Sequence, residues 1–346
     1  MRFCEGLLRL EPLIAKLFYI DERGEGRDKV YSTVFLKDTI LNKLQSNPVA
    51  QQMLQFGNNI GNLFPNEEAL CMASAFMQDK QTRIVVKKNR YEAQQLYQRL
   101  KPLINDTLLF VMEESLRVQA IASSPEDKQE QLYVLTQLVK EDKPRIIICN
   151  TAAFLRYLPD KELFKSLCFK FEVDQEITMT ELKQKLNRAG YTKVNYVDRP
   201  CTYASRGGIV DVYCLEYDHP IRIEFFDTVI ESIRIFHEET QRTIETIDSV
   251  LINPATDLLF TDDQIEYLQK EIDSELEKQH EKLIQDDYDF LLDYIEKDKI
   301  ALENYDIDPH LYIYFSYLKA NQFMDYVQGH IIFSSQEEVE NGYKKL

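Results

Sequence analysis

The chain has 346 residues, with 58 acidic side chains against 41 basic ones and a net charge of -17. This length predicts two or three domains, and an apolar content of 44% is enough to give each domain a core. This net negative charge excludes a broad electrostatic binding surface for DNA, RNA or an anionic membrane. Any contact with nucleic acid would have to be local.

The sequence contains no obvious membrane segment and no obvious cysteine framework. No stretch reaches the roughly 18 apolar residues that a membrane span requires, and charged residues interrupt the N-terminus at 1–10. We therefore expect a cytoplasmic protein that does not contact a membrane. The cysteines lack a CxxC pair, which is typical of reduced, mostly buried thiols. They are Cys4, Cys71, Cys149, Cys168, Cys201 and Cys214.

The first part of the chain predicts a parallel α/β domain. Residues 1–45, with a Gly24-Glu25-Gly26 turn, fit no regular pattern and are expected to form a peripheral extension. Between about 60 and 157, strands alternate with helices, which predicts a parallel sheet covered by helices. The expected helices are 67–77, 91–100 and 125–139, and the expected strands are 83–86, 107–112 and 145–149.

From Cys168 the pattern changes to that of a small antiparallel α+β unit. One helix is expected at 180–188, with Leu182 and Leu186 facing inward. Residues 221–225 alternate between apolar and polar side chains, as a half-buried strand does. The expected strands are 193–197, 209–213, 221–226 and 230–236.

One segment carries most of the acidity. Residues 257–308 contain 18 acidic and 5 basic side chains, a net of -13 that leaves -4 for the rest of the chain. Its apolar residues recur at helical spacing, which predicts amphipathic helices with solvated acidic faces. The alternative is a docking surface for a basic partner. The expected inward positions are Ile265, Leu268, Ile272, Leu276, Leu283, Phe290, Leu291 and Ile295.

A parallel α/β unit raises the question of a phosphate-binding loop, which would follow Asn58-Asn59-Ile60. Such a loop needs glycines, a Lys for the terminal phosphates and a Ser or Thr hydroxyl for magnesium. Here proline donates no N–H, and the two carboxylates of Glu67 and Glu68 would repel an anion. We therefore expect a degenerate loop that binds no nucleotide or other cofactor. Its residues are Phe64, Pro65, Asn66 and Glu67.

No other catalytic or metal motif stands out. His237-Glu238 and His280-Glu281 begin like zinc-peptidase helices but lack the second His, and no GxSxG elbow occurs. A nucleophilic triad assembled in space stays open. The run His330–Phe333 predicts a buried strand, followed by Ser334-Ser335 where a magnesium-binding strand would carry Asp-Glu.

The one locally basic element is 87–90, Lys-Lys-Asn-Arg, with Arg99 and Lys101 on the following helix. It is interpreted either as a solvated face or as a contact for a phosphate or an acidic partner.

The most informative segment is 203–213, Tyr-Ala-Ser-Arg-Gly-Gly-Ile-Val-Asp-Val-Tyr. Gly207-Gly208 allows a turn or bulge that most residues could not adopt, and it would aim Arg206 outward at the head of a strand. Alone, this pattern indicates only a turn. Together with several stretches that follow it, however, this segment resembles the small domain shared by the bacterial excision-repair helicase UvrB and the N-terminal part of the transcription-repair coupling factor (Mfd). These stretches are 220–227, 230–236 and 240–243.

The resemblance covers about residues 45–346 and is closer to the coupling factor. UvrB has a functional phosphate loop and a long Tyr-rich hairpin between that loop and the small domain. Here the loop is degenerate, and Val111 runs to Ser124 without room for the hairpin. The coupling factor's N-terminal module has lost nucleotide hydrolysis, so the resemblance implies a non-catalytic fragment that ends after this module. Stretches 120–126, 155–159 and 189–191 also match it in order.

The resemblance implies both an architecture and a partner. The expected fold is a degenerate P-loop-NTPase or helicase-like α/β domain in two pieces, 46–157 and 238–346, with a small α+β domain at 158–237 inserted between them. In the family the inserted domain docks the damage sensor UvrA. The implied function is to recruit UvrA for nucleotide excision repair at stalled transcription, while RNA polymerase and DNA would be contacted only through parts of the full protein that this chain lacks.

Three basic residues are candidates for the UvrA contact. Arg206 matches the family's UvrA-contacting Arg in the Arg-Gly-Gly turn. Lys193 follows Thr192, which stands where the coupling factor often has Arg, and Lys lacks the forked guanidinium. Arg199 is the third candidate. The alternative for all three is a solvent-exposed charge on a small sheet.

Two other functions stay open. A UvrB-like nucleotide-dependent DNA repair enzyme would need an intact phosphate loop. A general acidic interaction protein would use the helices of 257–308 and would persist if UvrA failed to bind.

Overall fold

The computed structural model describes residues 37–55, 57, 60–61, 63–112, 125–280, 282–305 and 308–333. The Gly24-Glu25-Gly26 turn, Asn58-Asn59, the 120–124 part of one matching stretch and Ser334-Ser335 lie outside these residues. The chain divides into two units, Met1–Glu114 with Lys143–Ala153 and Gln328–Leu346, and Ser115–Asp142 with Phe154–Val327. The expected boundaries at 46–157, 158–237 and 238–346 stay a prediction.

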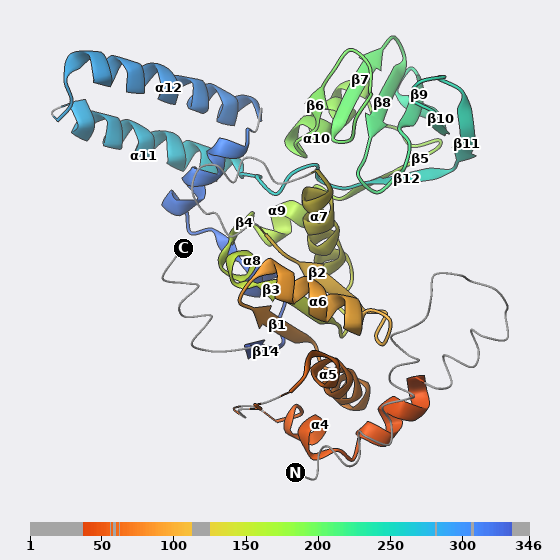
Figure 1. The fold of residues 1–346 in the computed structure, drawn as a ribbon. Coiled ribbons are helices and arrows are strands. Elements are labelled where there is room, and N and C mark those ends of the chain that lie inside the picture. Colours follow the sequence, from red (N-terminus) through yellow and green to blue (C-terminus); the bar gives the residue numbers. More distant parts are fainter. Residues whose placement is uncertain are drawn as a thin grey trace. The chain divides into compact units, whose positions relative to one another are not determined.

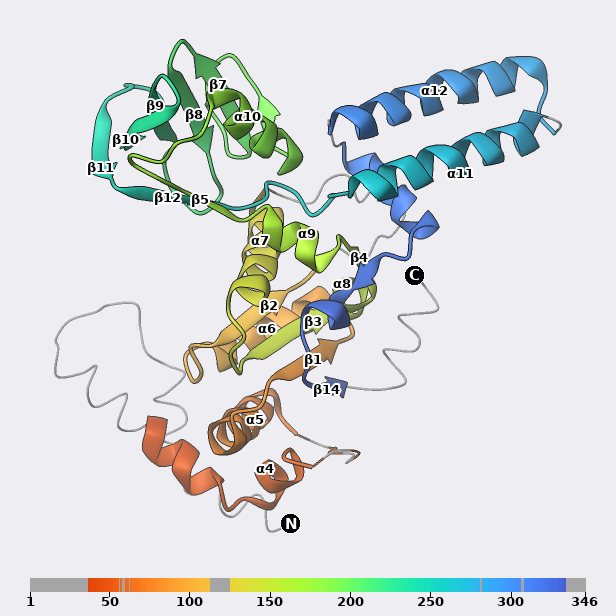
Figure 2. The same cartoon turned by 180° about the vertical axis from the view of Figure 1, so that it is seen from behind.

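A parallel sheet with the order β14-β1-β3-β2 lies at the centre of the first unit (Figures 1 and 2). β1 and β3 have neighbours on both sides and are buried along their whole length, so their sequences are nearly continuous apolar runs. The expected parallel sheet is confirmed. Its strands are β1 (Arg83–Lys87), β2 (Thr107–Phe110), β3 (Ile146–Asn150) and β14 (His330–Phe333).

Helices cover the sheet of the first unit. α6 (Arg90–Leu100) contacts β1, β2 and β3 and begins after Asn89, whose side chain accepts a hydrogen bond from the N–H of Glu92 at 2.9 Å. α5 (Pro65–Asp79) begins with a proline, which suits the first helical turn. A common core joins Leu70 of α5 and Leu96 of α6 to the sheet. Residues 37–44 are also helical, α4 covers Pro48–Gln52, and α8 (Thr151–Leu155) follows β3.

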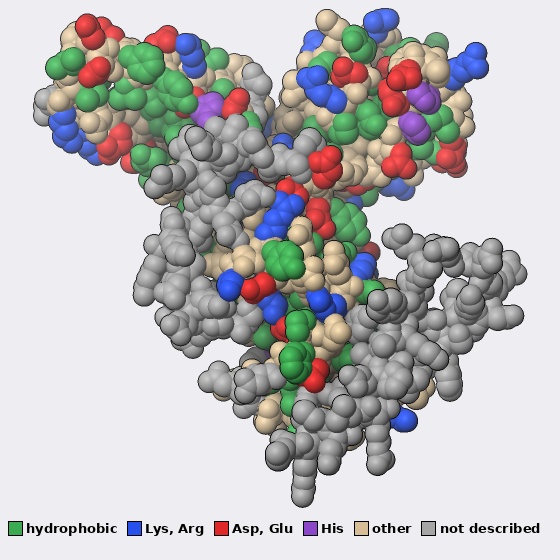
Figure 3. Space-filling view, viewed as in Figure 1, with side chains coloured by type: hydrophobic (Ala, Val, Ile, Leu, Met, Phe, Trp, Pro, Cys, Tyr) green, Lys and Arg blue, Asp and Glu red, His purple; other side chains and the backbone are tan. Residues whose placement is uncertain are grey.

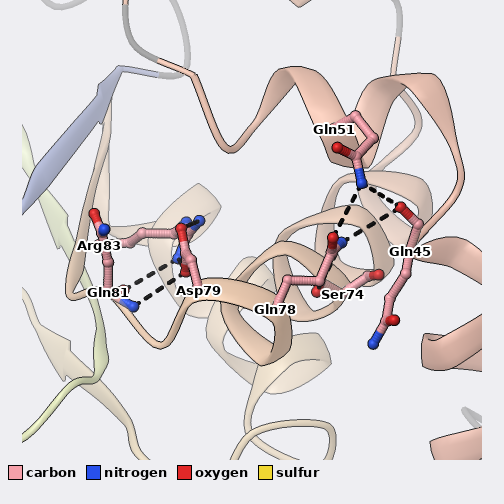
Figure 4. A network of polar contacts seen from close by, with 7 residues as sticks. All are labelled: Gln45, Gln51, Ser74, Gln78, Asp79, Gln81 and Arg83. Atoms are coloured by element: carbon pink, nitrogen blue, oxygen red, sulfur yellow. Dashed lines mark hydrogen bonds and ion pairs between the residues drawn. The ribbon is translucent and has the colours of Figure 1, made fainter.

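Polar contacts attach α4 and the preceding turn to α5 (Figure 4). The Gln51 amide donates to the carbonyl of Gln45 at 2.6 Å and to the Gln78 side chain at 3.0 Å. In the same view, the Arg83 guanidinium donates to both Asp79 oxygens at 2.9 and 2.8 Å. Arg83 is fully buried, so this bidentate pair satisfies a charge that would otherwise be costly inside the protein.

The second unit contains a six-stranded sheet with the order β11-β10-β9-β8-β7-β6. Neighbouring strands are antiparallel, apart from β6 and β7, which run parallel. The expected antiparallel α+β unit is therefore confirmed as a mixed sheet with a helix. The strands are β6 (Thr192–Lys193), β7 (Thr202–Arg206), β8 (Ile209–Tyr213), β9 (Ile221–Phe226), β10 (Val229–Phe236) and β11 (Thr243–Ile247).

The helix of this unit, α10 (Met179–Arg188), begins with a capping box between Thr178 and Glu181 and buries Leu182 and Leu186, as expected. One strand differs from its expected range, because β6 ends at Lys193 instead of continuing to 197. Asn195 and Asp198 favour turns, and the chain leaves the sheet there.

The remaining elements of the second unit include two small antiparallel sheets formed by strands far apart in the sequence. β4 (Tyr157–Leu158) pairs with β13 (Asn321–Gln322), and β5 (Phe169–Glu172) pairs with β12 (Ser249–Ile252). The same unit also contains the helices α7 (Pro125–Lys140), α9 (Lys161–Ser166) and α13 (Phe323–Tyr326).

The acidic segment forms two long helices, α11 (Asp262–His280) and α12 (Gln285–Asn304), followed by the 3-10 helix η2 (Pro309–Tyr317). The expected inward residues of α11 are confirmed, because Ile265, Leu268, Ile272 and Leu276 are buried. The expectation is wrong for Leu283 and Phe290. Both are exposed, because Leu283 lies in the turn between the helices and Phe290 is turned away from the seam. No described helix is long and apolar enough to cross a membrane.

Two further expectations can be compared with the structure. The strand expected to be buried at His330–Phe333 lies at an end of its sheet, and Ile331 and Phe333 are exposed. The thiols of Cys71, Cys149 and Cys214 are free and buried, while Cys168 and Cys201 are half-buried. Burial, with the nearby Glu67 charge, raises the pKa of Cys71 to about 12, so this thiol is unreactive at neutral pH. Cys4 lies outside the described residues.

Candidate partner-docking site

Arg206 lies at a tight turn between two strands of the six-stranded sheet. It is the last residue of β7 and pairs with Ile209, the first residue of β8, so only Gly207 and Gly208 form the loop. Gly207 has a φ of 56°, a conformation that favours glycine at this position of a hairpin turn. A Cβ on Gly208 would lie 3.0 Å from the carbonyl oxygen of Phe225. Gly207 thus suits the backbone conformation of this turn, and Gly208 leaves room for the Phe225 carbonyl.

The side chain of Arg206 is exposed, as expected, although the residue ends one strand instead of heading the next. Within the described part of the chain it makes no ion pair or side-chain hydrogen bond. The arginines of β9 and β10 in the same sheet differ. Arg222 donates to both oxygens of Asp211 at 2.7 and 2.8 Å, and Arg234 pairs with Glu224. The Asp211 carboxylate also raises the pKa of Arg222 above its usual range. Among the described residues, the Arg206 guanidinium is thus exposed and unpaired.

An exposed aromatic residue lies at the same end of the sheet. The N–H of Phe225 donates to the carbonyl of Gly208 at 2.8 Å, which places the turn between β9 and β10 beside the Arg206 turn. Phe226, at that turn, has 75% of its surface exposed. Sequence reasoning missed this residue, although the alternation in β9 contained the signal: Ile221 and Ile223 face inward, and the second Phe breaks the pattern.

Lys193 and Arg199 lie together, away from Arg206. Both line an open hollow of about 430 Å³ in the loop between β6 and β7. Lys193 pairs with Tyr203 in the sheet, so Arg206 lies three residues, or about 10 Å, further along β7. Arg199 lies 3.7 Å from Asp198, while Lys193 has no charged partner among the described residues. The complete lining is Lys193, Val194, Asn195, Tyr196, Asp198 and Arg199.

In the loop where a phosphate would bind, the polar side chains already form contacts with other groups of the protein. The Glu67 carboxylate accepts the N–H of Phe64 at 3.0 Å, and Pro65 contributes no N–H at the start of α5. Glu68 accepts two hydrogen bonds from Lys87 at 2.7 and 2.9 Å. The Asn66 side chain accepts from Arg99 at 2.9 Å. The helix start thus already carries carboxylates where an anion would bind.

The basic element at 87–90 is not a solvated face throughout. Lys87 is only 6% exposed and forms the ion pair with Glu68, so the expectation of a solvated side chain is wrong for this residue. Lys88 lies 3.3 Å from Glu92, and Asn89 caps α6. Lys101 donates to the backbone carbonyls of Asn105 and Thr107. These side chains act within the fold.

Comparison with known proteins connects this geometry to a family. Residues 169–258, which contain the whole six-stranded sheet and the Arg206 turn, match the family model of the UvrB interaction domain. The chain is 33% identical over 247 residues to the transcription-repair-coupling factor of Bacillus subtilis (strain 168), an alignment that covers 70% of this chain and 21% of the relative. The resemblance to the transcription-repair coupling factor is confirmed.

Other coupling factors show the same partial coverage. The protein of Staphylococcus haemolyticus is 30% identical over 223 residues, covering 64% of this chain and 19% of the relative. One from Staphylococcus epidermidis is 28% identical over 275 residues, covering 78% and 23%. The chain therefore spans about a fifth of the length of the curated coupling factors that it matches.

Proposed function

We propose that this chain is a docking module that recruits UvrA for nucleotide excision repair at stalled transcription and has no nucleotide chemistry of its own. The family match of residues 169–258 and the similarity to coupling factors support this role. The observation that carries it is the state of Arg206. It is exposed on a glycine turn without a partner among the described residues, while Arg222 and Arg234 are paired within the sheet.

An arginine held in this way is suited to recognise a carboxylate on another protein. Its planar guanidinium can form two parallel hydrogen bonds with one carboxylate. The glycine turn fixes the backbone beneath it, and the exposed ring of Phe226 supplies apolar contact area nearby. Lys193 and Arg199 would provide a second positive contact about 10 Å along the strand. We therefore assign Arg206 as the central contact, with Lys193 and Arg199 as secondary contacts.

We also propose that the chain contains a degenerate P-loop-NTPase or helicase-like α/β domain in two pieces, 46–157 and 238–346, separated by the insertion at 158–237. The pairing of β14 with β1 supports this proposal, because it joins strands from either side of the insertion in one parallel sheet. The carboxylates of Glu67 and Glu68 at the start of α5 support the loss of nucleotide binding. A UvrB-like enzyme would require this loop to accept phosphates.

The experiment is to mix the purified chain with UvrA and to measure the mass of the eluted species by light scattering after size-exclusion chromatography. We expect a complex whose mass is the sum of the two proteins. The Arg206→Glu variant, which reverses the charge at the turn, should elute separately from UvrA. Separate elution of the wild-type chain would contradict the proposed function, and an unchanged complex with Arg206→Glu would contradict the assigned site.

A further inference from the structure

The hairpin formed by α11 and α12 has a buried seam and an unusual outer face. Leu268 and Ile272 of α11 pack with Leu302 of α12 in one hydrophobic cluster, so apolar contacts fill the seam between the two helices. The rest of α12 would be polar if it faced only water. Instead, large apolar side chains are exposed at its start and along its length. They are Ile284, Phe290, Leu292, Tyr294 and Ile300.

The exposure of these side chains is substantial. Phe290 is 76% exposed and Ile284 is 68% exposed. Phe290 and Tyr294 are four residues apart and therefore lie on one side of the helix. Figure 3 shows hydrophobic side chains gathered on the hairpin, with acidic side chains around them. This side of α12, with Phe290 and Tyr294, is here called the outer face, and exposed apolar side chains that lie together mark a candidate contact site for another molecule.

The charge around this surface indicates the chemistry of the partner. α11 and α12 together carry 14 acidic side chains against 4 basic ones. Such a charge repels nucleic acid and disfavours a second copy of this acidic chain. The charge is complementary to a basic protein segment. The exposed acidic side chains of α12 are Asp286, Asp287, Asp289, Asp293, Glu296 and Glu303.

The outer face is also held in place from within. Asp298 of α12 is buried and accepts a hydrogen bond from the Tyr314 hydroxyl at 2.7 Å. His310 lies between Asp298 and Asp308, at 2.6 and 2.8 Å. These contacts fix the rotation of α12 relative to η2. A preformed face loses less conformational entropy on binding.

We propose that the outer face of α12 is a docking surface for a basic, amphipathic helical segment of a partner protein. Phe290 and Tyr294 receive the apolar side of that segment, and the surrounding carboxylates pair with its Lys or Arg side chains. This surface shares no residue with the Arg206 site, so the inference is independent of UvrA recruitment.

The probe is a synthetic peptide of about five helical turns with Leu at positions i, i+3, i+4 and i+7 and Lys at the exposed positions. One control peptide has the same composition in a scrambled order without an apolar face, and a second has Glu in place of Lys. Binding to the full chain is measured by fluorescence anisotropy at two salt concentrations. We expect saturable binding of the first peptide alone, weakened by salt.

The variant Phe290→Ser should weaken peptide binding at least roughly tenfold. Phe226→Ser is the matched control, because Phe226 is equally exposed but lies on the six-stranded sheet, and it should bind the peptide like wild type. Both variants should melt like wild type, since each side chain is largely in water.

Three results of the peptide titration would overturn the proposal. They are no saturable binding by the wild-type chain, equal binding of the scrambled peptide, and wild-type binding by Phe290→Ser. Concentration-dependent dimerisation of the chain that Phe290→Ser abolishes would assign the face to a second copy and would also overturn it. A failure of UvrA to bind would leave this result unaffected, so the two proposals fail separately.

Discussion

The Glu67 carboxylate accepts a hydrogen bond from the backbone N–H of Phe64, with Oε2 and N 3.0 Å apart. This contact lies at the start of α5, where the helix dipole and the unpaired N–H groups would otherwise attract an anion. Pro65 removes a further donor from the same turn. The Glu67 carboxylate therefore adds negative charge at the turn where a phosphate-binding loop would hold its ligand.

The first prediction is that Mg-ATP does not stabilise the chain. A nucleotide bound with micromolar affinity and present at millimolar concentration would raise the free energy of unfolding by about 4 kcal/mol. We expect no rise in melting temperature by differential scanning fluorimetry. Glu67→Ala should lower stability by about 0.5 to 1 kcal/mol through loss of the cap and should not restore binding, because Pro65 and Glu68 remain. ATP turnover, or a rise of several degrees, would contradict this account.

Local signals in the sequence predict the regular elements well. α10 could be predicted to within a residue, because Leu182 and Leu186 are spaced for one helical face and Thr178 with Glu181 forms a capping box. The pairing of β5 with β12 could not be predicted from the sequence, because the two strands are far apart along the chain and either strand could pair elsewhere. The end of β6 at Lys193 was also missed, since turn residues in a partly apolar run are a weak signal.

The candidate site was likewise predictable from the sequence only in part. The outward position of Arg206 could be predicted, because Gly207 and Gly208 require a turn beside it. That Arg206 lacks a partner among the described residues, whereas Arg222 has one, depends on which strands are neighbours and therefore on the fold. The burial of Lys87 against Glu68 likewise required the fold, because a basic run in the sequence is typical of a solvated surface.

The second prediction concerns this pair. Lys87 is buried, so Lys87→Met should leave the Glu68 carboxylate without its cation and lower the free energy of unfolding by about 1 to 3 kcal/mol. Adding Glu68→Gln to this variant should recover part of the loss. Chemical denaturation of wild type, both single variants and the double variant measures the coupling. A Lys87→Met variant as stable as wild type would show that the pair does not contribute.

The third prediction is a pH dependence from His310. Burial acts to lower the pKa of His310, but hydrogen bonds with Asp298 and Asp308 outweigh it and raise the pKa above its ordinary value of 6.5. A raised folded-state pKa gives stabilisation that is fully present below pH 6.5 and is lost as the pH rises through the folded-state pKa. The melting temperature of wild type, relative to that of His310→Gln, should therefore fall as the pH rises above 6.5.

The matched control for this measurement is His280→Gln. The ring of His280 packs against Tyr288 at a centroid distance of 4.6 Å instead of lying between two carboxylates. This variant removes an imidazole but leaves the contacts of His310 with Asp298 and Asp308 in place. A constant difference between wild type and His310→Gln would show that the imidazole is not held in its charged form by Asp298 and Asp308.

The most direct test of the docking function is a titration of UvrA with the wild-type chain, Arg206→Ala and Arg242→Ala, with a melting curve for each. Arg242 is also exposed and carries the same charge but lies near β11, so it controls for a general charge effect. Removing the Arg206 guanidinium would strand a partner carboxylate, at a cost of about 2 kcal/mol or more.

We predict that Arg206→Ala binds UvrA at least roughly 30-fold more weakly than wild type, that Arg242→Ala binds like wild type, and that all three proteins melt together. Equal binding by Arg206→Ala and wild type, or equal weakening by both variants, would contradict the assignment of the Arg206 turn as the UvrA contact.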